Sequence, residues 1–161
     1  MPFDPRRFFF RVAFPDDYSA YVGFLNERGG DLLRSGPIEV LDGEWNLRLF
    51  NHLWSRVLFV EDRQVHPKRL VGVASLHARW TARKGIGTVE YVLTDPEFRG
   101  QGLGRALMQH LIKEALEEFI PPLDVLELKS SPERTDALAL YESIGFQLEE
   151  GSDRHYRLNL R

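Results

Sequence analysis

Three β-rich runs follow one another at residues 56–62, 69–80 and 86–94, and they constrain the fold more than any other feature of the chain. The connectors between them, His66-Pro67-Lys68 and Arg83-Lys84-Gly85, are short and rich in turn-forming residues. Consecutive strands joined by short turns pair in the antiparallel direction. We therefore expect these three runs to form an antiparallel meander.

Helical and extended segments alternate after the meander. We expect a helix from Leu103 to about Phe119, because apolar residues recur at every fourth position until Pro121-Pro122 ends the pattern. A strand is expected at 124–130, followed by a helix that Ser131-Pro132 begins as N-cap and first helical residue and that Gly145 ends. This alternation predicts that the sheet becomes parallel around the turn before Leu103.

The remaining elements are expected nearer the two ends of the chain: a strand at 8–14, helices at 15–27 and 44–53, and short strands at 146–150 and 155–160. The length of 161 residues and the 43% hydrophobic content suit one domain, residues 1–161, with a single sizeable core. We predict an α+β fold with one mixed, mainly antiparallel sheet of about seven strands and about four flanking helices.

Composition excludes several classes of protein. The formal net charge of −3 argues against a nucleic-acid binder, and no run of residues is apolar enough to span a membrane. The first residues contain a short apolar run of three phenylalanines, too short for a signal peptide, so we expect a cytoplasmic protein. The chain has no cysteine, and its five histidines lack metal-ligand spacing, so we expect no metal.

A glycine-rich turn, FRGQGLGRAL at residues 98–107, opens the helix that begins near Leu103. Its third glycine comes one position too early for a dinucleotide-binding turn, and it lacks the Lys and Ser or Thr of a nucleotide-triphosphate loop. Unshielded backbone N–H groups at a helix start can bind an anion, which Arg99 and Arg105 would also contact. A glycine turn whose arginines point into solvent is the alternative interpretation.

Two motifs in this order resemble those of the GCN5-related N-acetyltransferase (GNAT) superfamily. They are EYVLTDPEFRGQGLGRAL at 90–107 and ALALYESIGF at 137–146, and a weaker similarity lies at Arg11-Val12-Ala13 with Asp16-Asp17. The resemblance implies acetyl-CoA as co-substrate and a primary amine that attacks it directly in a ternary complex. It also implies that the parallel pair at the centre of the sheet splays apart.

The resemblance further implies how the cofactor is held. Backbone amides of residues 100–105 would bind the diphosphate, the pantetheine arm would lie between the strand ending at Thr94 and the strand 124–130, and a backbone N–H near Leu93 would polarise the thioester carbonyl. This family often has Asn where the chain has Arg134, so Arg134 or Ser131 would replace that contact. The implied cofactor-binding residues are Val92, Leu93, Thr94, Arg99, Gly100, Gln101, Gly102, Leu103, Gly104, Arg105, Ser131 and Tyr141.

Two residues are candidates for proton transfer. Glu90 would accept the proton of the amine, directly or through water; the alternative is a solvent-facing glutamate, with Val89 and Tyr91 on the opposite face of the strand. Tyr141 would donate a hydrogen bond to the departing thiolate of coenzyme A, although its place on an apolar helix face also suits a core residue.

The expected function is transfer of acetyl from acetyl-CoA to a primary amine of a small molecule. An inactive CoA-binding regulatory module, another acyl donor such as succinyl-CoA, and a protein N-terminus or lysine as acceptor are the alternatives. In this superfamily the region 31–55 typically covers the acceptor site. Here it carries the acidic residues Glu39, Asp42 and Glu44, which are compatible with a cationic amine substrate; a solvated helix start explains them equally well. The resemblance is also compatible with a homodimer.

Overall fold

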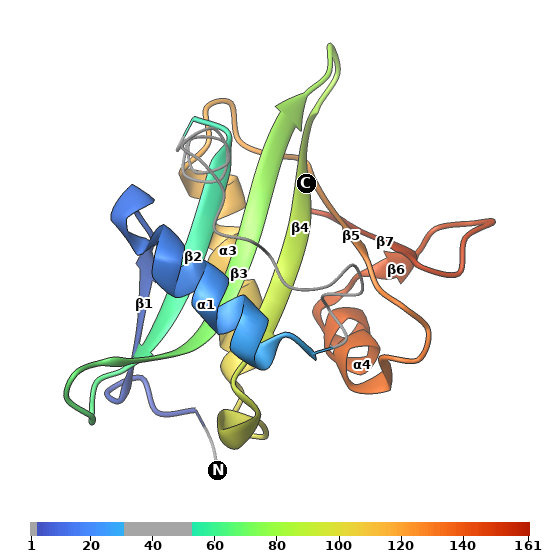
Figure 1. The fold of residues 1–161 in the computed structure, drawn as a ribbon. Coiled ribbons are helices and arrows are strands. Elements are labelled where there is room, and N and C mark those ends of the chain that lie inside the picture. The colour runs from blue at the N-terminus through green and yellow to red at the C-terminus, as the bar shows by residue number, and fades with distance from the viewer. Residues whose placement is uncertain (1–2, 31–52) are drawn as a thin grey trace.

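Seven strands form a single sheet in the order β1-β2-β3-β4-β5-β7-β6 (Figure 1). The structure is a computed structural model that describes residues 3–30 and 53–161. The strands are β1 (Phe8–Val12), β2 (Ser55–Asp62), β3 (Arg69–Trp80), β4 (Gly85–Thr94), β5 (Val125–Lys129), β6 (Gln147–Leu148) and β7 (His155–Asn159). Every neighbouring pair is antiparallel except β4 and β5, which are parallel. The predicted meander and the predicted change of direction are both confirmed.

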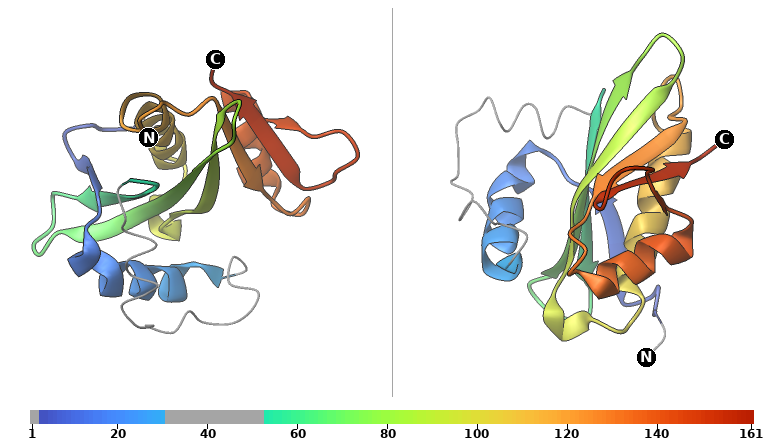
Figure 2. Two further views of the ribbon diagram at one scale, coloured as in Figure 1. Left: turned by 90° about the horizontal axis from the view of Figure 1, so that it is seen from above. Right: turned by 90° about the vertical axis from the view of Figure 1, so that its right-hand side faces the viewer.

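Helices cover both faces of this sheet (Figure 2). On one face, the α1 face, lies α1 (Tyr18–Arg28), which follows the short 3-10 helix η1 (Pro15–Asp17). On the opposite α3–α4 face lie α3 (Leu103–Glu117), preceded by the 3-10 helix η3 (Pro96–Phe98), and α4 (Thr135–Ile144). The helix predicted at 44–53 falls almost entirely outside the described residues. Among these residues, no helix has both the length and the apolar character needed to cross a bilayer.

Each face of the sheet carries its own apolar core. The stripe predicted along the helix after the glycine turn is buried against the sheet, with Leu103, Leu107 and Leu111 at 2% exposure or less. Burying one such side chain stabilises a fold by about 1.5–3 kcal/mol. A second core lies under α1, where Tyr21 and Leu25 pack on Phe59 and Val73. The two cores hold the sheet between its helices.

The start of α4 differs from the prediction. Ser131-Pro132 was expected to be its N-cap and first helical residue, but the helix begins at Thr135 with Arg134 in the N-cap position. The backbone N–H of Arg134 donates to the carbonyl oxygen of Ser131, and the Ser131 hydroxyl donates to Glu133. Residues 131–134 therefore close a turn of their own, and the helix follows it.

A β-bulge interrupts β4 and overturns a second expectation. Val73 of β3 pairs with Leu93, whereas Ser75 pairs with Glu90, so β4 carries one additional residue. Tyr91 takes up this residue with a φ of 51°, in the left-handed region. Val89 consequently belongs to the core under α3 while Tyr91 packs against the core under α1. The prediction that both residues share one face is wrong, because simple alternation does not survive a bulge.

Candidate functional site

The parallel pair at the centre of the sheet is short. β4 and β5 pair at three positions, Ile86 with Val125, Gly87 with Leu126 and Thr88 with Glu127, and then diverge toward the lower end of Figure 1. Gly87 leaves room there for two leucine side chains, because an added Cβ would lie 2.7 Å from a side-chain carbon of Leu76 and 2.8 Å from one of Leu126. Within residues 3–30 and 53–161, no strand pairs with this edge of β4 beyond Thr88, which agrees with the splay that the resemblance implied.

A cavity of about 500 Å³ occupies this gap. Glu90, Lys129 and His155 line it from the α1 face, since their neighbours Val89, Leu128 and Tyr156 point into the core under α3. Tyr141 and Arg134 line it from α4, on the other side of the sheet. The cavity thus reaches from one face of the sheet to the other, between β4 and β5. Two reactants could meet in it from opposite sides.

The backbone of β4 faces this gap at alternate residues. The N–H of Asp95 donates to the carbonyl of Val71 at 2.7 Å, so the peptide groups of Leu93, two residues earlier, also point toward β3. The peptide groups of Val92 and Thr94 then point toward the gap. Of the three backbone positions predicted to contact the cofactor arm, the register favours Val92 and Thr94 over Leu93.

The glycine-rich turn begins α3, and no side chain among the described residues caps this helix. Gly100 and Gly102 have φ values of 78° and 81°, which a residue with a Cβ rarely adopts, and Gly102 is the N-cap. The first N–H bonded within the helix is that of Ala106, which donates to Gly102 at 3.0 Å. The amides of Leu103 and Gly104 therefore lack intrahelical acceptors and lie at the positive end of the helix. This geometry suits an anion.

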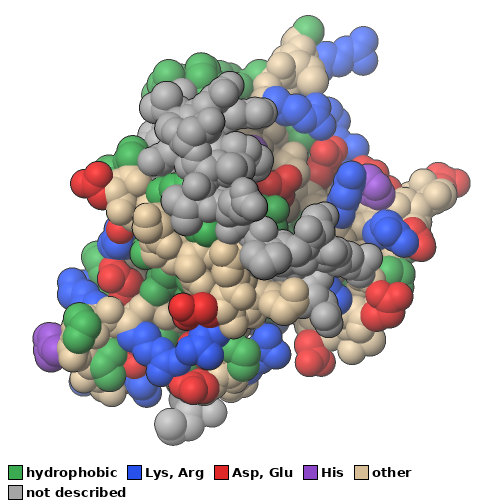
Figure 3. Space-filling view, viewed as in Figure 1, with side chains coloured by type: hydrophobic (Ala, Val, Ile, Leu, Met, Phe, Trp, Pro, Cys, Tyr) green, Lys and Arg blue, Asp and Glu red, His purple; other side chains and the backbone are tan. Residues whose placement is uncertain are grey.

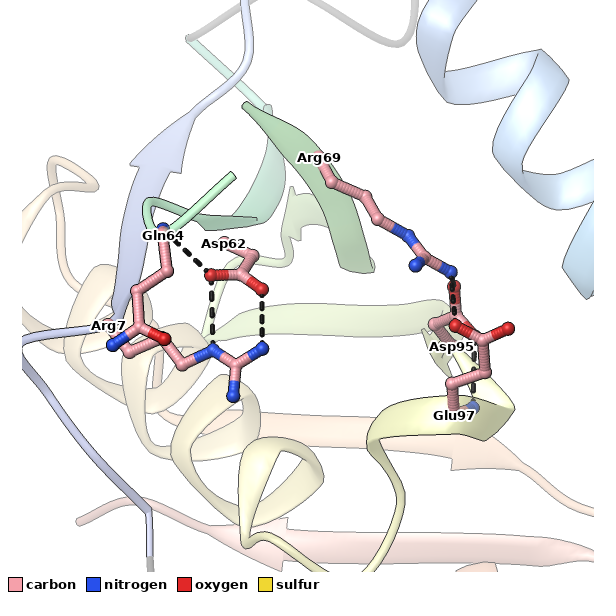
Figure 4. Close-up of polar contacts among 6 residues, drawn as sticks. All are labelled: Arg7, Asp62, Gln64, Arg69, Asp95 and Glu97. Carbon is pink, nitrogen blue, oxygen red and sulfur yellow. Dashed lines mark hydrogen bonds and ion pairs between the residues drawn. The ribbon is translucent and has the colours of Figure 1, made fainter. Parts of the chain in front are cut away.

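A buried carboxylate holds the turn in place (Figure 4). Asp95, with its side chain 1% exposed, accepts from the backbone N–H of Glu97 at 3.0 Å and from the Arg69 guanidinium at 2.7 Å. Arg28, the last residue of α1, lies 3.5 Å from the same carboxylate. Arg69 also pairs with Glu97 at 2.8 Å. The end of β4 is thus tied to α1 and β3 immediately before the unshielded amides.

The two arginines beside the turn differ in their surroundings. Arg99 is exposed and has no carboxylate within 4.0 Å in residues 3–30 and 53–161. Arg105 donates to the hydroxyl of Ser143 on α4 at 2.6 Å. Arg99 can therefore contact a phosphate without breaking an existing interaction, whereas Arg105 also links α3 to α4.

Glu90 belongs to a short chain of polar groups on the α1 face. Its carboxylate is 49% exposed and lies 3.6 Å from Nε2 of His77, and Nδ1 of His77 lies 3.0 Å from the hydroxyl of the buried Ser55. Sequence reasoning missed His77 and Ser55. The information needed to find His77 is the register of the β3–β4 hairpin. Trp80 pairs with Gly85, which places His77 opposite Thr88 and diagonal to Glu90.

Tyr141 is both a core residue and a cavity residue. It is 5% exposed and packs on Phe146 with ring centroids 5.9 Å apart, yet it also lines the cavity. Burial raises the pKa of Tyr141 above its ordinary value, and the nearby positive charge of Arg134 partly offsets this shift. None of the described residues makes a hydrogen bond to its hydroxyl. A protonated phenol without a protein acceptor is suited to donate to a bound group.

The other predicted residues are placed as follows. Gln101 lies in the turn between the two positive-φ glycines, and Ser131 lies in the turn before α4. The acidic residues Glu39, Asp42 and Glu44 lie outside the described residues. Residues 3–30 and 53–161 contain no group of three or more His, Asp or Glu side chains that could hold a metal ion.

Comparisons with known proteins agree with this arrangement. The family model described as "Acetyltransferase (GNAT) family" matches residues 12–146. The [ribosomal protein bS18]-alanine N-acetyltransferase of Escherichia coli is 44% identical over 59 residues, which is 37% of this chain and 38% of that protein. The glucosamine 6-phosphate N-acetyltransferase of Trypanosoma brucei brucei is 34% identical over 95 residues, 57% of this chain and 58% of that protein. The chain thus spans less than two thirds of these relatives.

Solved structures extend the similarity of fold to nearly the whole chain. The spermidine N-acetyltransferase of Vibrio cholerae, solved with CoA and spermine, superposes with a TM-score of 0.72 over 96% of both chains at 21% identity. At that identity the likeness shows the fold alone. The family model, in contrast, matches residues 12–146, a range that includes the splayed strands, the glycine turn and the Tyr141 helix. The chain belongs to the GNAT family of acetyltransferases.

Proposed function

We propose that this protein transfers the acetyl group of acetyl-CoA to a primary amine of a small molecule. The observation that carries the proposal is the cavity through the splayed sheet, with a carboxylate on one face and a tyrosine hydroxyl on the other. Acetyl-CoA supplies a thioester carbonyl that an amine can attack. The nitrogen–carbon bond forms, the carbon–sulfur bond breaks, and the thiolate of coenzyme A leaves.

The chain offers matching contacts for the cofactor. The unshielded amides of residues 103–105 and the guanidinium of Arg99 would bind its diphosphate. The free edge of β4 would pair with the amides of the pantetheine arm as a further strand would. The N–H of Val92 would donate to the thioester oxygen, whose negative charge grows during attack.

Glu90 would accept the proton that the amine must lose. An alkylammonium has a pKa of about 10.4, so at neutral pH the reactive free amine is a minor form. The Glu90 carboxylate lies on the face opposite the glycine turn, where the amine would enter, and it faces the imidazole of His77 at 3.6 Å. His77, held by Ser55, would help to accommodate the proton. Such general-base catalysis typically contributes about 10²- to 10⁴-fold.

A small acceptor suits the cavity, since the whole cavity has the size of an ordinary small-molecule site, about 300–1,000 Å³, and must also admit the pantetheine arm. The Escherichia coli relative named above acts, by its name, on an alanine of a ribosomal protein, so a protein N-terminus is the second candidate acceptor. A panel of amines and a peptide beginning with Ala would distinguish the two. The predicted homodimer and cytoplasmic location remain predictions.

The experiment compares wild type with Glu90→Gln and with the control Glu117→Gln, an exposed glutamate of α3 that pairs with Lys113. Release of coenzyme A is followed with a thiol reagent, which meets no protein background because the chain has no cysteine. We expect Glu90→Gln to lower kcat/KM by about 100-fold near pH 7 and to recover as the pH approaches the pKa of the amine. The control should match wild type.

Two results would contradict the proposal. If Glu90→Gln keeps the wild-type rate and pH profile, Glu90 is not the base. If wild type binds coenzyme A but releases no thiol with any amine of the panel, the alternative of a CoA-binding regulatory module is correct. A preference for succinyl-CoA over acetyl-CoA in a competition assay would change the donor and keep the chemistry.

A further inference from the structure

The carboxylates that line the cavity each lie close to a basic side chain. Glu127 lies 3.3 Å from the guanidinium of Arg79, and Glu149 lies 3.7 Å from that of Arg157. Glu90 faces His77, as described above. The two arginines lie outside the lining of the cavity. The negative charges of Glu127 and Glu149 are therefore balanced by arginines that do not line the cavity.

The cations of the same wall are not balanced. Neither Lys129 nor Arg134 has a carboxylate within 4.0 Å in the part of the chain that the structure describes, and both line the cavity. The wall consequently presents two uncompensated positive charges. Lys129 is exposed and Arg134 is half-buried, so the charge of Lys129 is accessible to a ligand that enters the cavity.

Lys129 and Arg134 lie on opposite sides of the sheet. Arg134 precedes α4, on the face where the glycine turn begins α3, and its charge acts on Tyr141. Lys129 projects to the α1 face, because Leu128 before it is buried in the core under α3. Its register partner on β7 is His155, whose imidazole lines the same part of the cavity. Figure 3 looks onto this face and shows basic, acidic and histidine side chains gathered where β5 and β7 lie.

We propose that the acceptor is a primary amine that also carries an anionic group, a carboxylate or a phosphate. This inference rests on the proposed function, since it places the amine at Glu90 and the anion at Lys129. The two residues lie on the two strands that diverge, β4 and β5, so they face each other across the gap. The imidazole of His155 supplies a further donor to the anion. The site thus has a negative charge at Glu90 and a positive charge at Lys129. A zwitterionic acceptor matches both charges in one orientation only.

This anion is distinct from the anionic groups of the cofactor. The diphosphate is assigned to the amides of residues 103–105 at the start of α3, on the opposite face of the sheet from Lys129. A cationic polyamine, in contrast, would bring a second positive charge toward Lys129. The wall therefore disfavours polyamines as acceptors.

The test measures binding, so that it does not depend on turnover. Two pairs of probes differ in the anionic group: ethanolamine with O-phosphoethanolamine, and butylamine with 4-aminobutanoate. Each is titrated calorimetrically into the protein with and without coenzyme A. The variants are Lys129→Gln, Lys129→Arg, which keeps the charge, and the control Lys68→Gln, an exposed lysine in the turn between β2 and β3.

We expect the anionic member of each pair to bind wild type at least 10-fold more tightly than its neutral counterpart. Lys129→Gln should abolish the preference, whereas Lys129→Arg and Lys68→Gln should retain it. The inference is overturned if wild type binds both members of a pair equally, or if Lys129→Gln retains the preference. Failure of the proposed function would look different. Wild type would still bind the anionic probe more tightly, but no thiol would be released from acetyl-CoA.

Discussion

Replacement of Tyr141 with Phe separates chemistry from folding more cleanly than any other substitution in this site. The hydroxyl makes no hydrogen bond to a described residue, and the ring packs on Phe146 in both forms of the side chain. Removing the oxygen therefore deletes no interaction within the described structure. We expect the free energy of unfolding of Tyr141→Phe to change by less than about 1 kcal/mol.

The expected loss of rate follows from one hydrogen bond. A hydrogen bond to a charged group is worth about 1.5–3 kcal/mol, and the departing thiolate carries its charge in the transition state. This range corresponds to a fall in kcat of about 10- to 150-fold. Because burial raises the pKa of Tyr141, the phenol should stay protonated to a higher pH than an ordinary tyrosine, and any fall in wild-type kcat from its ionisation should come at a correspondingly higher pH.

The assay combines thiol release with thermal unfolding and calorimetric binding of coenzyme A. The matched control is Tyr156→Phe, which removes a hydroxyl from another buried tyrosine, on β7. Tyr141→Phe should reduce kcat with nearly unchanged affinity for coenzyme A and unchanged stability, and the control should have the smaller effect on kcat. A variant with kcat within twofold of wild type, or one that loses rate in proportion to lost stability, would refute the role of the hydroxyl.

Three further predictions concern the framework of the site. Gly100→Ala and Gly151→Ala, both at a φ of 78° with open space around the added Cβ, should each lose about 1 kcal/mol of unfolding free energy, but calorimetry should find weaker binding of coenzyme A for Gly100→Ala alone. Asp95→Ala, which removes the cap and the buried partner of Arg69, should lose about 2–3 kcal/mol in urea unfolding. The Arg7 guanidinium donates to the Asp62 carboxylate at 2.8 and 3.1 Å (Figure 4) and lowers its pKa. The stability advantage of wild type over Asp62→Asn should therefore be complete above the ordinary carboxylate pKa and disappear as the pH falls through the lowered pKa.

Much of the fold could be predicted because local patterns and tertiary structure agree. The strand predicted at 69–80 has the bounds of β3, and the i+4 stripe of the helix after the glycine turn is its buried face. The prediction for the start of α4 was wrong, because Ser131 and Pro132 are favourable residues both at the beginning of a helix and in a turn. Which structure forms depends on where β5 ends, and a local pattern does not contain that information.

The candidate site was predictable where backbone chemistry demands particular residues. Gly100 and Gly102 have positive φ values, which glycine adopts most readily, so the glycines in the sequence already mark this turn. The partnership of Glu90 with His77 depends on the register of two strands, and the bulge at Tyr91 has no marker such as glycine or asparagine. Lys129 was missed for a similar reason, since a lysine at a strand end is ordinary until the neighbouring strand is seen to diverge from it.

The divergence of β4 and β5 also bears on self-association. A sheet normally exposes its unpaired peptide groups at its outer rims, where strands of other molecules can add one after another. Within the described part of the chain, a further pair of unpaired strand edges, those of β4 and β5, faces inward across the gap that begins beyond Thr88. An extended segment that enters this gap becomes flanked on both sides and leaves no new rim behind it. The gap between β4 and β5 therefore accepts one extended segment, and that segment exposes no edge on which further strands could add to form a fibre.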